Sequence, residues 1–175
     1  MTTNETANRR NLLPLLGDFL ALTKPRVMSL LLVSAVAGAF LGAQSTPSLK
    51  IIIAVIIGGA LASGGAASLN MAYESELDKK MGRTKNRPVA EGRIAFNTAI
   101  LFGIALNVGS FVILTLMTNV LAAGLAIVGT LLYFGLYTVI LKRTTTQNIV
   151  IGGAAGAVPP LVGYAASAGT VDLSA

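Results

Sequence analysis

Three side chains with oxygen donors recur at every fourth position near the middle of the sequence. Asn70, Glu74 and Asp78 would share one face of a helix, each displaced by about 40° from the one before. Acidic groups near a helix C-terminus oppose the helix dipole, so they favour a compensating cation. Because the chain contains no His and no Cys, oxygen ligands of this kind suit Mg²⁺ best. The spacing therefore predicts a metal site, and we take the three residues as the candidate catalytic set.

The same acids also admit a plainer interpretation as an exposed network of helical ion pairs. In that network Glu74, Glu76 and Asp78 would pair with the basic residues just beyond them, Lys79, Lys80 and Arg83. A basic run that continues before Pro88 favours the metal site, because Arg83, Lys85 and Arg87 offer donors for phosphate oxygens. Metal-binding acids beside such cations predict a diphosphate site at a membrane surface.

The elements that must position these residues are membrane spans. The chain has 175 residues, of which 54% are hydrophobic and only 11% charged, against roughly 25% charged in soluble domains. Five apolar stretches have about the length of a bilayer crossing: residues 27–43, 51–72, 95–117, 120–141 and 148–168. Pro159 and Pro160 predict a break or a kink in the last of them. We expect an all-α, polytopic transmembrane helical bundle that forms a single domain over residues 1–175.

Basic residues gather in alternate connecting segments. Four Lys and Arg residues precede the first span, six lie in 73–93 and two in 142–147, whereas the opposite side has only Lys50. By the positive-inside rule this places residues 1–26 and both basic loops in the cytoplasm, in a multi-pass protein of the cell inner (plasma) membrane. The net charge of +6 is then explained by topology, so the expected partner is the lipid bilayer and not nucleic acid.

The run from Asn70 to Pro88 resembles the first aspartate-rich motif of the UbiA intramembrane prenyltransferases. Its continuation from Met81 is similar to that of the haem-farnesylating members of the family. Two further stretches also agree with that subfamily: Leu22–Val27, and Leu141–Thr144 followed by Gln147–Gly156 with the two prolines. The resemblance covers residues from about 18 to 169, and the combination of motifs is highly specific.

This resemblance implies that the farnesyl group of farnesyl diphosphate is transferred to a vinyl group of haem B, giving haem O for terminal oxidases. It implies Mg²⁺ at Asn70, Glu74 and Asp78 to assist the departure of diphosphate, and haem A synthase or a terminal oxidase assembly as a protein partner. The substrate-binding residues that it implies are Lys24, Arg26, Arg83, Lys85, Arg87, Tyr133, Tyr137, Lys142, Arg143 and Asn148.

The two tyrosines, and two pairs of glycines in the apolar stretches, also have structural explanations. Tyr133 and Tyr137 could face a developing allylic cation, but interfacial anchoring and packing would explain them equally well. The pairs Gly38 with Gly42 and Gly152 with Gly156 are typical of closely packed membrane helices.

The UbiA family has about nine spans and a second aspartate-rich motif, whereas here the only acid after Glu91 is Asp172. The chain therefore looks like the N-terminal five spans of such an enzyme, and we expect it to be inactive alone. Three alternatives stay open: a UbiA enzyme with a quinone or chlorophyll-type acceptor, a membrane protein that transports cations, and a catalytically inactive membrane fragment.

Overall fold

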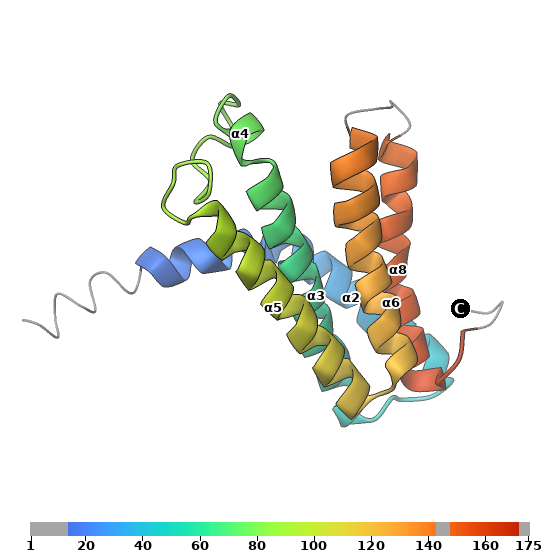
Figure 1. Ribbon diagram of the computed structural model, residues 1–175. Helices are drawn as coiled ribbons and strands as arrows, with labels where there is room; N and C mark the ends of the chain where they lie inside the picture. Colours follow the sequence, from blue (N-terminus) through green and yellow to red (C-terminus); the bar gives the residue numbers. More distant parts are fainter. Residues whose placement is uncertain (1–13, 143–147, 172–175) are drawn as a thin grey trace, which may run out of the picture.

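The computed structural model describes residues 14–142 and 148–171, and every regular element in these two ranges is helical (Figure 1). A helix over residues 14–22 precedes seven further segments: α2 (Pro25–Ala43), α3 (Leu49–Tyr73), α4 (Ser75–Asp78), α5 (Phe96–Met117), α6 (Val120–Thr130), the π-helix η1 (Leu131–Leu141) and α8 (Asn148–Ala168). The all-α prediction is therefore confirmed.

Four of these segments are long and apolar enough to cross a membrane: α2, α3, α5 and the continuous run of α6 with η1. Local signals set several of their ends. Pro25 opens α2, and the Ser48 and Asn119 side chains cap the first turns of α3 and α6. Helix α8 has the bounds expected of a fifth span, whose crossing stays a prediction. Of the break or kink predicted at Pro159 and Pro160, the break is wrong, because α8 is continuous through both, and the kink stays a prediction.

Close contact between α2 and α8 depends on small residues. A Cβ atom added to Gly38 would clash with the backbone of Pro160, and one added to Gly163 would clash with the backbone of Ala35. One added to Gly42 would likewise meet the backbone of Tyr164. The predicted role of Gly38 and Gly42 in helix packing is thus confirmed, and these close contacts lie at Pro160 and in the part of α8 that follows it.

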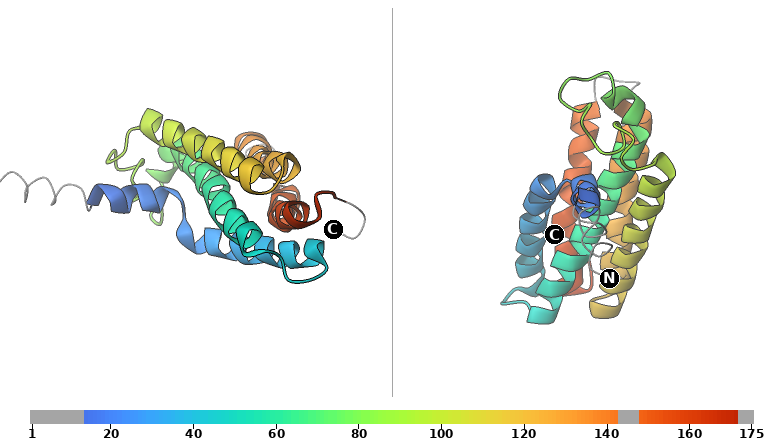
Figure 2. Two further views of the ribbon diagram at one scale, coloured as in Figure 1. Left: turned by 90° about the horizontal axis from the view of Figure 1, so that it is seen from below. Right: turned by 90° about the vertical axis from the view of Figure 1, so that its left-hand side faces the viewer.

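Helix α3 is the central element that carries the candidate motif. It packs against α5, while α8 packs against α2 on one side and α6 on the other (Figures 1 and 2). Two buried hydroxyls join α3 to α5: Ser68 donates to the carbonyl of Ala99 at 2.8 Å, and Ser110 donates to that of Gly58 at 2.7 Å. These hydrogen bonds attach α3 to α5, one close to the motif at Ser68 and the other remote from it at Gly58.

Candidate functional site

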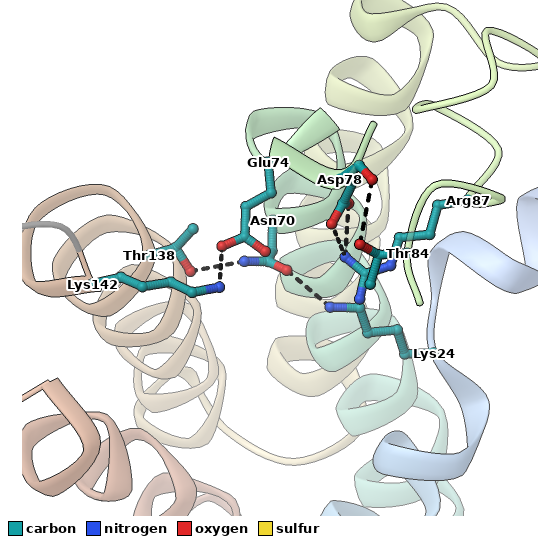
Figure 3. A network of polar contacts seen from close by, with 8 residues as sticks. All are labelled: Lys24, Asn70, Glu74, Asp78, Thr84, Arg87, Thr138 and Lys142. Atoms are coloured by element: carbon teal, nitrogen blue, oxygen red, sulfur yellow. Dashed lines mark hydrogen bonds and ion pairs between the residues drawn. The ribbon is translucent and has the colours of Figure 1, made fainter. Parts of the chain in front are cut away.

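The three motif side chains lie at the end of α3, where the chain passes through a turn at Glu74 into α4. Backbone hydrogen bonds from Glu74 N to Asn70 O (3.0 Å) and from Asp78 N to Glu74 O (2.9 Å) maintain helical spacing across that turn. The expected common face is therefore present (Figure 3). Asn70, Glu74 and Asp78 are only 2%, 7% and 3% exposed, so their polar atoms depend on partners within the protein.

A different cation holds each of the three side chains. Lys24 donates from Nζ to Asn70 Oδ1 at 2.8 Å, and Lys142 at the end of η1 forms an ion pair with Glu74. Arg87, from the loop after α4, contacts both carboxylate oxygens of Asp78 through Nη1, at 3.0 and 2.7 Å. Two cations distant in sequence and one from the adjacent loop thus converge on one face of α3 and α4.

The interpretation as an exposed helical network is wrong for Glu74 and Asp78. It holds for Glu76, whose carboxylate pairs with Lys79 at 2.6 Å on the exposed side of α4. The difference arises because α4 is a single short turn. The chain after it folds back through successive turns and brings Arg87, not a helical neighbour, to Asp78.

Lys24 stands at the junction between the helix over 14–22 and α2, with a left-handed backbone (φ 50°). Burial, followed by the nearby positive charge of Arg87, lowers the pKa of Lys24 to about 8. The charge of Glu74 opposes that shift in part. Because burial destabilises the protonated form of Lys24, an anion that binds beside it would stabilise that form.

Thr138 in η1 completes the cluster, although no sequence pattern singles it out. Its hydroxyl is 3.0 Å from Asn70 Nδ2, and the residue is 1% exposed. A threonine within an apolar span is unremarkable in sequence, and only the packing of η1 beside α3 reveals its role.

Of the cluster residues, Lys24 lines an apolar cavity of about 240 Å³ within the bundle. Lys24 and Tyr133 line its polar end. Its walls come from four helices and include Val27, Met28, Leu31 and Ala35 of α2, Gly59, Ala62, Ala66 and Ala67 of α3, Ala126 and Gly129 of α6, and Ala155, Pro159 and Val162 of α8. An apolar chain with an anionic head would suit such a cavity.

A second hollow, of about 350 Å³, lies on the other side of Lys24 and is strongly basic. Its lining includes Lys24, Arg83, Arg87 and Arg93, of which Arg93 is held by Asp18 at 3.0 Å. An anion could therefore meet cations from either hollow, with Lys24 common to both.

The structure does not bring all the predicted substrate-binding residues together. Arg26 and Lys85 are exposed and line neither hollow, and Tyr137 stacks on Tyr133 with ring centroids 5.9 Å apart but does not line the cavity. The Tyr137 ring packs against Gly152, where an added Cβ would lie 2.6 Å from it. Arg143 and the side chain of Asn148 lie outside the described residues.

The donors of the motif suit a hard divalent cation. Within residues 14–142 and 148–171, no group of three or more acidic, His or Cys side chains is placed to hold a metal. The site has two carboxylates and one amide oxygen, and each of them already faces a positive nitrogen. Mg²⁺ commonly binds one or two carboxylates and takes its remaining ligands from water and substrate phosphates, so the residues present fit Mg²⁺ that is bound together with a phosphate compound.

Comparison with known proteins agrees with this arrangement. The chain is 47% identical over 165 residues to a protoheme IX farnesyltransferase of Trichodesmium erythraeum, covering 94% of this chain and 50% of that protein. It is 48% identical over 159 residues to a protoheme IX farnesyltransferase of Chloroflexus aurantiacus, covering 91% of this chain and 27% of that protein. The chain therefore spans about half the length of the first relative and about a quarter of the second.

A solved structure of a digeranylgeranylglyceryl phosphate synthase has the same fold. Its TM-score is 0.75 at 20% identity, and the match covers 85% of this chain and 52% of that one. The profile of the UbiA prenyltransferase family matches residues 31–175. From this match and the relatives, we conclude that the chain, a multi-pass membrane protein, belongs to the UbiA prenyltransferase family.

Proposed function

We propose that this chain carries the prenyl diphosphate site of an enzyme that transfers the farnesyl group of farnesyl diphosphate to a vinyl group of haem B, giving haem O. The observation that carries the proposal is the position of the buried acid and cation cluster at the polar end of an apolar cavity. The cavity suits the prenyl chain and the cluster suits the diphosphate. The haem acceptor is supported by the names of the relatives at 47% and 48% identity.

This reaction requires the protein to stabilise a departing anion and a developing carbocation. As the farnesyl C1–O bond breaks, its electron pair leaves with diphosphate, and Lys24, Arg87 and Lys142 can donate to the phosphate oxygens. Mg²⁺ held by Asn70, Glu74 and Asp78 would neutralise part of that charge. Tyr133 at the polar end of the cavity offers a π-face to the allylic cation. The vinyl group then bonds to C1, and water adds to the haem-side cation with release of a proton.

The proposed function also includes the orientation of the protein in the membrane and its cellular location. With twelve of the thirteen basic residues on the side of the motif, the site opens to the cytoplasm, in a protein of the cell inner (plasma) membrane. Haem A synthase or a terminal oxidase assembly is the protein partner that we propose for receiving haem O.

A chimera tests the function, because the chain spans only about half of the Trichodesmium relative. This chain would replace the matching part of that relative, and the unmodified relative would serve as the positive control. With farnesyl diphosphate, haem B and Mg²⁺, we expect mass spectrometry to show haem O. The proposal would be overturned if the chimera inserted normally and formed no haem O while the control did. Transfer to a quinone or a chlorophyll-type acceptor instead would show that the acceptor has been assigned wrongly.

A further inference from the structure

We infer that Thr138 is a positioning residue, which fixes the amide of Asn70 so that its oxygen, and not its nitrogen, faces the cations of the site. The inference rests on the proposed function, because it concerns the residues that would hold Mg²⁺ and diphosphate. It starts from the two hydrogen bonds of one buried hydroxyl.

The Thr138 hydroxyl has a single proton, and a fixed acceptor takes it. Oγ1 lies 2.9 Å from the carbonyl oxygen of Tyr133, to which it donates. A carbonyl oxygen can only accept, so the hydroxyl has only lone pairs to offer Asn70. The atom of Asn70 that lies 3.0 Å from Oγ1 must therefore be the donor, Nδ2.

The contact at the other end of the Asn70 amide independently supports the same orientation. Lys24 Nζ lies 2.8 Å from Asn70 Oδ1, and an ammonium group can only donate. Because Asn70 is 2% exposed and Thr138 is 1% exposed, water has little access to either side. One amide orientation satisfies both neighbours, and the flipped orientation would satisfy neither.

The π-helix makes this geometry available. In an α-helix a threonine hydroxyl bonds to the carbonyl three or four residues earlier, whereas Thr138 reaches back five residues to Tyr133. Such spacing matches the wider turn of η1, and π-helical segments often occur at functional sites. Thr138 thereby places its lone pairs against α3 at the level of Asn70.

Three variants distinguish a role of Thr138 in positioning Asn70 from a role in helix packing. Thr138→Val keeps the shape and removes the hydroxyl, whereas Thr138→Ser keeps the hydroxyl. Ser110→Ala, remote from the site, removes another buried hydroxyl that joins two helices. Isothermal titration calorimetry of the purified chain in micelles would measure the Kd of pyrophosphate in the presence of Mg²⁺, and thermal unfolding would be followed in parallel.

We expect Thr138→Val to weaken binding by roughly tenfold, as loss of one hydrogen-bonded orientation would, and Thr138→Ser to stay within about twofold of wild type. Ser110→Ala should lower the thermal midpoint without changing Kd. The inference would be overturned if Thr138→Val bound like wild type, if Thr138→Ser bound as weakly as Thr138→Val, or if Ser110→Ala weakened binding equally.

A measurement on the metal-free wild type keeps the inference testable if the variants fail to fold or if no pyrophosphate binds. In protein labelled with ¹⁵N-asparagine, the side-chain signal of Asn70 is the one that Asn70→Asp removes. Its NH₂ protons should exchange with solvent much more slowly than those of the exposed Asn86. Equal exchange rates would show that the Asn70 amide is not held. Absence of pyrophosphate binding with a protected amide would instead contradict the proposed function alone.

Discussion

Substituting Ala62 by leucine would shorten the apolar cavity from within. Ala62 lines the cavity on α3, eight residues before Asn70, which places it about 12 Å from the motif along the helix axis. If the prenyl chain extends from the cluster into this cavity, its far end must pass Ala62. The new side chain would occupy that space, while the cluster would keep its hydrogen bonds and ion pairs.

The size of the effect follows from the bulk added. Ala62→Leu introduces about three carbon atoms and excludes a similar number of ligand carbons from the cavity. At about 0.8 kcal/mol for each buried methylene group, the loss is about 2 kcal/mol, or roughly thirtyfold in Kd. Geranyl diphosphate is one isoprene unit shorter, and we expect its affinity to change by less than about threefold.

Calorimetric titration of both diphosphates in the presence of Mg²⁺ would measure this selectivity. Ala60→Leu is the matched control, since Ala60 lies on the same helix but does not line the cavity. Equal weakening of the farnesyl and geranyl compounds by Ala62→Leu, or unchanged binding of both, would refute the placement of the prenyl chain in this cavity.

Two further predictions concern packing and charge. Gly38→Ala should destabilise the protein by about 1–3 kcal/mol, because the added Cβ meets the Pro160 backbone. As a control, Gly124→Ala should be neutral or stabilising, because the space around Gly124 is open. Equal thermal midpoints for the two variants would contradict the close packing of α2 on α8. For the metal-free protein, stability should rise by up to about 3 kcal/mol as the pH increases from 8 towards 10.5, because unfolded Lys24 keeps its proton over this interval while folded Lys24, with a pKa of about 8, loses it. Thermal unfolding across this pH range would show the rise, and Lys24→Met should reduce it; an identical rise in that variant would rule out Lys24 as its source.

Much of the fold could be predicted because bilayer thickness determines the length of an apolar run. The bounds expected for the five helices agree with the observed ones to within two residues. The π-helical character of residues 131–141 could not be predicted, since nothing in that apolar run distinguishes a wider helical turn from an ordinary one. The continuity of α8 through its prolines could not be predicted either, because the residues of α2 that pack against it lie far away in the sequence.

The candidate site was only partly predictable, for a similar reason. Helical spacing was enough to place Asn70, Glu74 and Asp78 on one face, because that relation is local. Their partners Lys24, Thr138 and Lys142 come from other elements, and only the packing of the bundle brings them to α3. The turns after α4 bring Arg87 to Asp78. Spacing along a helix instead favoured Lys79, Lys80 and Arg83 as partners, and of these only Lys79 pairs with an acid among the described residues, Glu76.

Our central proposal is that the buried acids bind a prenyl diphosphate through Mg²⁺. The most direct test is to measure the affinity of the purified chain for farnesyl diphosphate, once with Mg²⁺ and once with EDTA. Asp78→Asn would be measured beside Glu76→Gln, which changes an exposed acid of the same short helix. We predict that EDTA and Asp78→Asn each weaken binding at least tenfold, as expected for loss of a charge-assisted contact, and that Glu76→Gln leaves it unchanged. Equal affinity with Mg²⁺ and with EDTA, or wild-type affinity in Asp78→Asn, would contradict the claim.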